Sequence, residues 1–172
     1  APVAYDHMDD VLAFGRPPAA LKRELGRLVR EAALLSASAE PLAAQLRALG
    51  GREPLLVGNG VEFAHFAAAA PPPVPAALAA LPPPRCLYVG SVAEWFDFEL
   101  LHAVARALPA VSIAVVGPLR PALAARARQA PANCHYLGAR PYAELPAWLL
   151  NADAGLIPFL RTPLTAGVDP VK

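Results

Sequence analysis

The second half of the chain alternates short apolar runs with longer amphipathic ones, and this alternation limits the possible folds more than any other feature. Each apolar run ends at a glycine or a proline, and helical patterns separate them; the runs span residues 86–89, 112–116, 134–137 and 154–157. Such strands are typical of a parallel sheet that is covered on both faces. Because the loops after parallel strands share one edge, we expect them to face a common crevice, where α/β sheets bind ligands.

The first of these units, CLYVGSVAEWFD at residues 86–97, carries the clearest local signals. A short strand ends at Gly90, a loop follows, and a helix is predicted over residues 98–108. Asp97 is placed to cap that helix, because its carboxylate can accept from the first backbone N–H groups. Free N–H groups after such a turn suit a phosphate. An ordinary strand–helix corner explains the same stretch equally well. The large side chains of Trp95 and Phe96 suit either a nucleotide cover or the core.

The first half of the chain contains weaker βα patterns. Helices are predicted over residues 21–35 and 40–49, short strands over 34–38 and 54–57, and a turn at Gly58-Asn59-Gly60. Residues 67–84 consist almost entirely of alanine, proline, valine and leucine, which predicts a semi-rigid linker with one helical turn at 76–81. A polar cluster at residues 5–10 is expected to be a solvated loop. A metal site built from Asp6, His7, Asp9 and Asp10 is the alternative.

Composition excludes several classes of function. The net charge of +1 gives no electrostatic argument for binding nucleic acid. Cys86 and Cys134 both fall in predicted strands, which indicates buried thiols in a reducing compartment. No apolar run is long enough to cross a bilayer, so we expect a soluble cytoplasmic protein, and peripheral attachment to a membrane stays open. The sequence contains no nucleophile elbow, no Walker loop and no paired metal-binding cysteines.

Read in order, short motifs along nearly the whole chain resemble those of GT-B glycosyltransferases of the family-four type. Gly58-Asn59-Gly60-Val61-Glu62, followed by Phe66, resembles the "NGVD…F" hinge of that family, and LYVGSVAEWFDFELL resembles the first strand and loop of its nucleotide-sugar domain. Residues 114–118, 133–138, 142–146 and 153–159 resemble its "hIGP", "NVhfLG", "YeeLP" and "DVgliPF" motifs, and residues 169–172 resemble the opening of "DPvKxyEY".

The resemblance implies an α/β fold that is a partial GT-B: the end of one Rossmann-like domain and the first half of a second one with a parallel sheet. Residues 1–58 are expected to be the tail of the amino-terminal, acceptor-side domain. Residues 59–84 would form the hinge and the linker. Residues 85–172 would form the first part of the carboxy-terminal, nucleotide-sugar-binding domain. The chain is therefore expected to be a fragment that is inactive without the rest of its protein.

The resemblance also implies a function and a set of site residues. The expected activity is retaining transfer of a hexose from a nucleotide-sugar to a glycan or a lipid-linked saccharide, as in bacterial polysaccharide biosynthesis at the inner face of the membrane. Neither a metal nor a cofactor is expected. The expected donor-binding residues are Gly90, Ser91, Glu94, Arg140, Asp169 and Lys172, and the expected acceptor-side residues are His7 and Asp10. The glutamate that usually contacts the donor is expected after Lys172, so no catalytic residue is assigned.

Two alternatives to a transferase stay open. A nucleotide-sugar epimerase has the same fold, but it needs acid and base side chains that face the sugar, and the sequence shows no clear set of them. The other alternative is a Rossmann-like domain that only binds a nucleotide or a partner.

Overall fold

The computed structural model describes residues 1–14, 17–67 and 72–168, which form two compact units. The first unit comprises Ala1–Val61 together with the segment that begins at Arg161, and the second unit comprises Glu62–Leu160. This division differs from the expected one at the end of the chain. Residues 161–168, which the resemblance assigns to the nucleotide-sugar domain, belong to the first unit. There α8 (Pro163–Ala166) is followed by Gly167, which lies against the buried side chain of Leu42.

The first unit is a small parallel sheet with two helices. The strands β1 (Ala4–His7), β2 (Leu34–Ala37) and β3 (Leu55–Leu56) pair in the order β1-β2-β3. The helices are α1 (Ala19–Glu31) and α2 (Glu40–Ala48). Alternate residues of β2 are buried, because the helices contribute a core that includes Leu25, Val29, Leu35, Ala37, Leu42 and Leu46.

The strand β1 corrects the expectation of a solvated loop at residues 5–10. Residues 4–7 pair in parallel with residues 34–37. The outward-facing Asp6 accepts a hydrogen bond from the Ser36 hydroxyl at 2.7 Å, while His7 points inward and is 1% exposed. The polar side chains of this strand are thus bonded to their neighbours, which allows polar residues at these positions. Because they are polar, the strand lacks the apolar pattern by which strands are usually recognised.

The second unit contains a sheet of four parallel strands, as the sequence predicted. The strands pair in the order β6-β5-β4-β7, where β4 is Arg85–Val89, β5 is Ser112–Val116, β6 is Cys134–Gly138 and β7 is Ala154–Gly155. The central strand β5 is buried along its whole length. All four strands point the same way, so their carboxyl ends lie at one edge.

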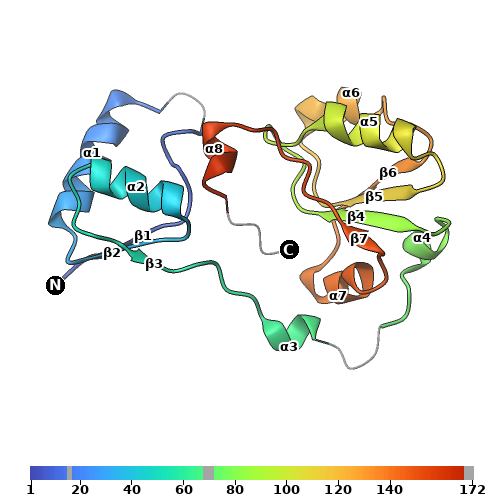
Figure 1. Cartoon of the computed structure of the whole chain (residues 1–172), viewed down its shortest axis with the longest axis horizontal. Helices are drawn as coiled ribbons and strands as arrows, with labels where there is room; N and C mark the ends of the chain where they lie inside the picture. The colour runs from blue at the N-terminus through green and yellow to red at the C-terminus, as the bar shows by residue number, and fades with distance from the viewer. Residues whose placement is uncertain (15–16, 68–71, 169–172) are drawn as a thin grey trace. The chain divides into compact units, whose positions relative to one another are not determined.

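Helices cover both faces of this sheet (Figure 1). One face packs against α5 (Phe98–Ala107) and α6 (Ala124–Ala127), in a core that includes Tyr88, Phe96, Phe98, Leu101, Ile113 and Val115. The opposite face packs against α7 (Leu145–Leu149), in a core that includes Leu87, Ala114, Val116 and Trp148. The predicted cap is confirmed, since the Asp97 carboxylate accepts from the backbone N–H of Leu100 at 2.9 Å.

The helical patterns after β5 and after β6 form short helices that begin as 3-10 turns. The turn Pro121–Leu123 (η1) precedes α6, and the turn Tyr142–Glu144 (η2) precedes α7. Pro121 lies in the first turn of η1 and Pro146 in the first turn of α7. Backbone N–H groups there have no acceptor within the helix, so a proline costs no hydrogen bond.

Part of the alanine- and proline-rich segment at residues 67–84 packs against the second sheet and is not a linker, contrary to the expectation from its composition. After α3 (Phe63–Phe66) and the four residues 68–71, which are outside the described residues, the helix α4 (Ala76–Ala79) docks onto the second sheet. Leu78 is fully buried and Leu81 is 8% exposed, both in the core beside Trp148. The second half of this segment therefore belongs to the second unit. Across the described residues, no helix combines the length and apolar character needed to cross a membrane.

Candidate functional site

A pocket of about 190 Å³ opens at the carboxyl edge of the second sheet. Its lining comes from the ends of β4 and β5, from the loops after β4, β5 and β6, and from the start of α7: Val89, Gly90, Ser91, Val116, Gly117, Pro118, Ala139, Arg140 and Leu145. Hydrogen bonds join these loops to one another. The Gly90 N–H donates to the Val116 carbonyl at 2.9 Å, and the Gly117 N–H donates to the Gly138 carbonyl at 3.0 Å. The common edge that parallel strands predicted is confirmed, but the loop after β7 contributes no residue to the lining of this pocket.

The pocket depends on two glycines that approach each other closely. Gly117 has a φ of 150°, and a β-carbon at this position would overlap the carbonyl oxygen of Gly90. A β-carbon at Gly90 would lie 2.7 Å from the Tyr88 hydroxyl oxygen. Side chains are therefore excluded where the two loops meet, and a ligand in the pocket can approach the backbone itself.

Arg140 is the charged residue in the lining, and it is half-buried. Its guanidinium carbon lies 5.3 Å from the centroid of the Trp148 ring, which is 2% exposed. The ring attracts the guanidinium electrostatically, and this contact leaves N–H groups of Arg140 free to bind a second partner. An arginine held in this way can pair with a phosphate.

Ser91 contributes polar groups to the same lining. Its carbonyl accepts a hydrogen bond from the Tyr88 hydroxyl at 2.9 Å. Its own N–H and hydroxyl donate to no other residue in the part of the chain that the structure describes. Together with Arg140, these donors give the pocket a chemistry that suits an anion.

The other donor-binding candidates are placed differently. Glu94 lies outside the pocket lining and pairs with Arg120 at 2.7 Å, where both side chains are exposed; the pair joins the loops after β4 and β5. Asp169 and Lys172 fall outside the described residues. Of the two aromatic candidates, Phe96 fills the core and is 1% exposed, whereas Trp95 is half-buried.

The expected acceptor-side residues, His7 and Asp10, are joined in the first unit by a buried chain of hydrogen bonds. The Gln45 amide nitrogen donates to Asp10 Oδ2 at 2.7 Å, so the Gln45 oxygen faces His7 Nε2 at 3.1 Å. His7 must then donate through Nε2, and its Nδ1 lies 3.1 Å from the Tyr5 hydroxyl. Both ring nitrogens are hydrogen-bonded, which fixes the orientation of the His7 ring.

Gln45 and Tyr5 were not singled out by the sequence, although a signal for Gln45 exists. It lies on the buried face of α2 between Leu42 and Leu46, where a polar side chain needs a partner. Among the described residues, no group of three or more histidine, cysteine, aspartate or glutamate side chains is placed to hold a metal ion.

Comparison with known proteins finds similarity at the level of structure. No protein-family model and no curated protein sequence matches this chain. It is similar to crystal structures of HepE from Anabaena in complex with UDP and glucose, with UDP, and with UDP-glucose, with TM-scores of 0.69, 0.70 and 0.68 and 17% sequence identity in each case. The match covers 90% of this chain and 45% to 46% of the HepE chains, so this chain spans less than half their length. The fold is therefore α/β and corresponds to part of a GT-B fold.

Proposed function

We propose that the complete protein is a glycosyltransferase, and that the pocket at the edge of the second sheet binds its nucleotide-sugar donor. The observation that carries this proposal is the pocket itself. It lies at the carboxyl ends of three parallel strands and is lined by close-packed glycines, Ser91 and Arg140. Open α/β sheets bind ligands at this edge. HepE, which has the same fold, was crystallised with UDP and with UDP-glucose.

The proposed role of the pocket is to hold the donor diphosphate. Ser91 offers an N–H and a hydroxyl, and Arg140 offers a positive charge. Negative charge grows on the diphosphate as the sugar departs, and fixed donors stabilise it. The reaction as proposed needs no metal or cofactor. By the family resemblance, the donor site is completed by Asp169, by Lys172 and by a glutamate after Lys172. The same resemblance favours transfer of a hexosyl group with retention of configuration.

The proposed acceptor is a glycan or a lipid-linked saccharide that the first unit binds. His7 and Asp10 are bonded to Gln45 and buried, so their proposed role on this side is to support the acceptor site from within and not to contact the acceptor. A lipid-linked acceptor would place the complete protein at the cytoplasmic face of a membrane. Because this chain spans less than half of the HepE chains, we expect transfer from the complete protein and at most nucleotide binding from the 172 residues alone.

Calorimetric titration of the chain with UDP, UDP-glucose and other nucleoside diphosphates tests the binding part of this proposal. We expect binding that weakens about tenfold in Arg140→Gln, because a hydrogen bond to a charged partner is lost. Arg128→Gln is the matched control, since Arg128 is an exposed arginine of the same unit outside the pocket. Equal affinity of both variants, or no binding of any nucleotide by the unaltered chain, would contradict the proposed donor site.

Assays of sugar transfer and of donor hydrolysis by the complete protein test the catalytic part. Transfer from a nucleotide-sugar to a saccharide acceptor is expected. Tight nucleotide binding without transfer from any donor would favour the non-catalytic alternative.

A further inference from the structure

Tyr88 is a buried residue of β4 whose side chain reaches the loop that lines the pocket. It is 3% exposed, and its ring makes edge-on contacts with Phe96 at 5.0 Å and with Phe159 at 6.3 Å between centroids. These partners follow β4 and β7, so the ring is held by two of the loops at the pocket's edge of the sheet. Its hydroxyl therefore has a fixed position.

That hydroxyl determines how the loop turns after the strand. It donates to the Ser91 carbonyl at 2.9 Å and lies so close to Gly90 that no β-carbon would fit there. Burial raises the pKa of Tyr88, and a hydrogen bond with Trp95, which lowers it, is the smaller effect. The hydroxyl is thus protonated, and able to donate, throughout the neutral range.

The residues on either side of Ser91 are fixed by other bonds. The Gly90 N–H donates to Val116, and the Val92 N–H donates to the Pro118 carbonyl at 2.8 Å. Ser91 is therefore held at its carbonyl by Tyr88, and its two neighbours are held by the last residue of β5 and by the loop after that strand. Its N–H and hydroxyl, which donate to no described residue, are the groups left over for a ligand.

We propose that Tyr88 is a positioning residue, whose hydroxyl holds the Ser91 carbonyl so that the Ser91 N–H and hydroxyl meet the phosphates of a bound nucleoside diphosphate. This inference rests on the proposed function. It adds that a residue of the core, which does not line the pocket, sets the affinity of the pocket for phosphate. Preorganised donors bind an anion more tightly than mobile ones, because their orientation costs no further free energy on binding.

Tyr136 provides a matched control within the same unit. It is also partly buried in the core, its ring stacks on Phe98 with 6.1 Å between centroids, and its hydroxyl lies 3.1 Å from His102 Nε2. Its hydroxyl contacts a side chain of α5 and not the pocket loop. Tyr88→Phe and Tyr136→Phe each remove one hydroxyl from this core: the first with its bonds to Ser91 and Trp95, the second with its bond to His102.

The experiment is calorimetric titration of the unaltered chain and of both variants with UDP and with uridine, which lacks the phosphates. We expect Tyr88→Phe to weaken UDP binding about fivefold and to leave uridine binding unchanged. Tyr136→Phe is expected to leave both affinities unchanged. Unfolding curves of the two variants, followed by tryptophan fluorescence, show whether their stabilities match.

Several outcomes would overturn the inference. Unchanged UDP binding in Tyr88→Phe, or an equal loss for UDP and uridine, would show that Tyr88 does not act through the phosphates. Amide NMR spectra of the unliganded chain give a second readout, in which Tyr88→Phe is expected to move the signals of residues 90–92. If these signals stay in place, the inference fails whether or not nucleotide binds. If they move but the unaltered chain binds no nucleotide, the proposed function fails and the phosphate role of Tyr88 fails with it.

Discussion

The two sheets of this molecule are both parallel and both flanked by helices, yet the residues at their carboxyl edges differ. At the edge of the second sheet, β4 and β5 are followed by glycines and β6 ends in one, and the backbone there lines a pocket. At the edge of the first sheet, β1 ends in His7 and leads to Asp10, and these side chains bond to each other through Gln45. Small residues leave room for a ligand, whereas bonded side chains occupy that room themselves. The same topology thus supports a binding site in one unit and an internally satisfied polar network in the other.

The comparison predicts that the glycine at the end of β5 is the most sensitive position of the pocket. Gly117→Ala places a β-carbon on the Gly90 carbonyl, so we expect a loss of about 4 kcal/mol in the free energy of unfolding of the second unit. Both tryptophans, Trp95 and Trp148, belong to that unit, so denaturation followed by tryptophan fluorescence reports on it alone.

Gly138→Ala serves as the control for this variant. Gly138 has a φ of 77°, but no atom lies within 4 Å of the added β-carbon, so backbone strain of about 1 kcal/mol is expected. Equal losses in the two variants would show that backbone conformation, and not the contact between the two loops, matters at this edge.

The next largest effect is expected at Leu78, within the segment whose composition suggested a linker. Leu78 is fully buried under the second sheet, so Leu78→Ala should destabilise the second unit by about 3 kcal/mol. Val74→Ala, at a side chain that is 40% exposed, should change little. Denaturation curves that coincide with that of the unaltered chain would mean that the segment is a free connector after all.

In the first unit, removal of Gln45 should break the polar network at two points. Gln45→Ala leaves His7 Nε2 and Asp10 Oδ2 without their partner, at an expected cost of about 2 kcal/mol. Hydrogen exchange of the α2 amides measures this cost, and the ring nitrogen signals of His7 should shift because Nε2 loses its acceptor. Ser36→Ala removes a hydrogen bond from the other face of the same sheet and should have a smaller effect. Ring nitrogen signals of His7 that stay unchanged in Gln45→Ala would contradict the bond between His7 and Gln45.

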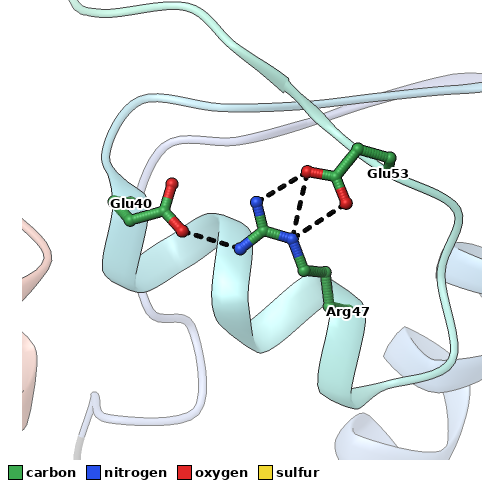
Figure 2. A network of polar contacts seen from close by, with 3 residues as sticks. All are labelled: Glu40, Arg47 and Glu53. Carbon is green, nitrogen blue, oxygen red and sulfur yellow. Dashed lines mark hydrogen bonds and ion pairs between the residues drawn. The ribbon is translucent and has the colours of Figure 1, made fainter.

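The smallest effect is expected for the exposed ion pairs of α2. Arg47 contacts Glu40 at 2.7 Å and Glu53 at 2.6 Å (Figure 2). The hydrogen bond from Arg47 lowers the pKa of Glu53 below its ordinary 4.5. The resulting stabilisation is fully present above pH 4.5 and is lost as the pH falls through the lowered pKa. Arg47→Ala should remove this part of the pH dependence of α2 exchange, and salt should weaken it in the unaltered chain. A pH dependence that Arg47→Ala leaves intact would assign it to other groups.

The sequence predicted the second sheet better than the first because its strands are short, apolar and ended by glycine or proline. It missed β1 because a strand whose polar side chains are paired, such as Asp6 with Ser36, carries no apolar pattern. It overstated the linker because Leu78 and Leu81 are two residues among many alanines and prolines, and their burial depends on the sheet beneath them.

Of the donor-binding residues expected from the sequence, Gly90, Ser91 and Arg140 follow predicted strands and line the pocket. Glu94 was expected to bind the donor as well, but it pairs with Arg120 outside the pocket lining. The sequence contains no feature that reveals this pairing. Tyr88 reads as an ordinary core residue, because only the fold brings its hydroxyl to the Ser91 carbonyl.

The most direct test of the account is to map nucleotide binding on the chain by amide NMR during a titration with UDP. The account predicts saturable shifts at Gly90, Ser91, Gly117 and Arg140, at the edge where the second sheet leaves a pocket, and no shifts in the network of His7 and Gln45. Shifts confined to the first unit, or none at any UDP concentration, would contradict the assignment of the donor site to the second sheet.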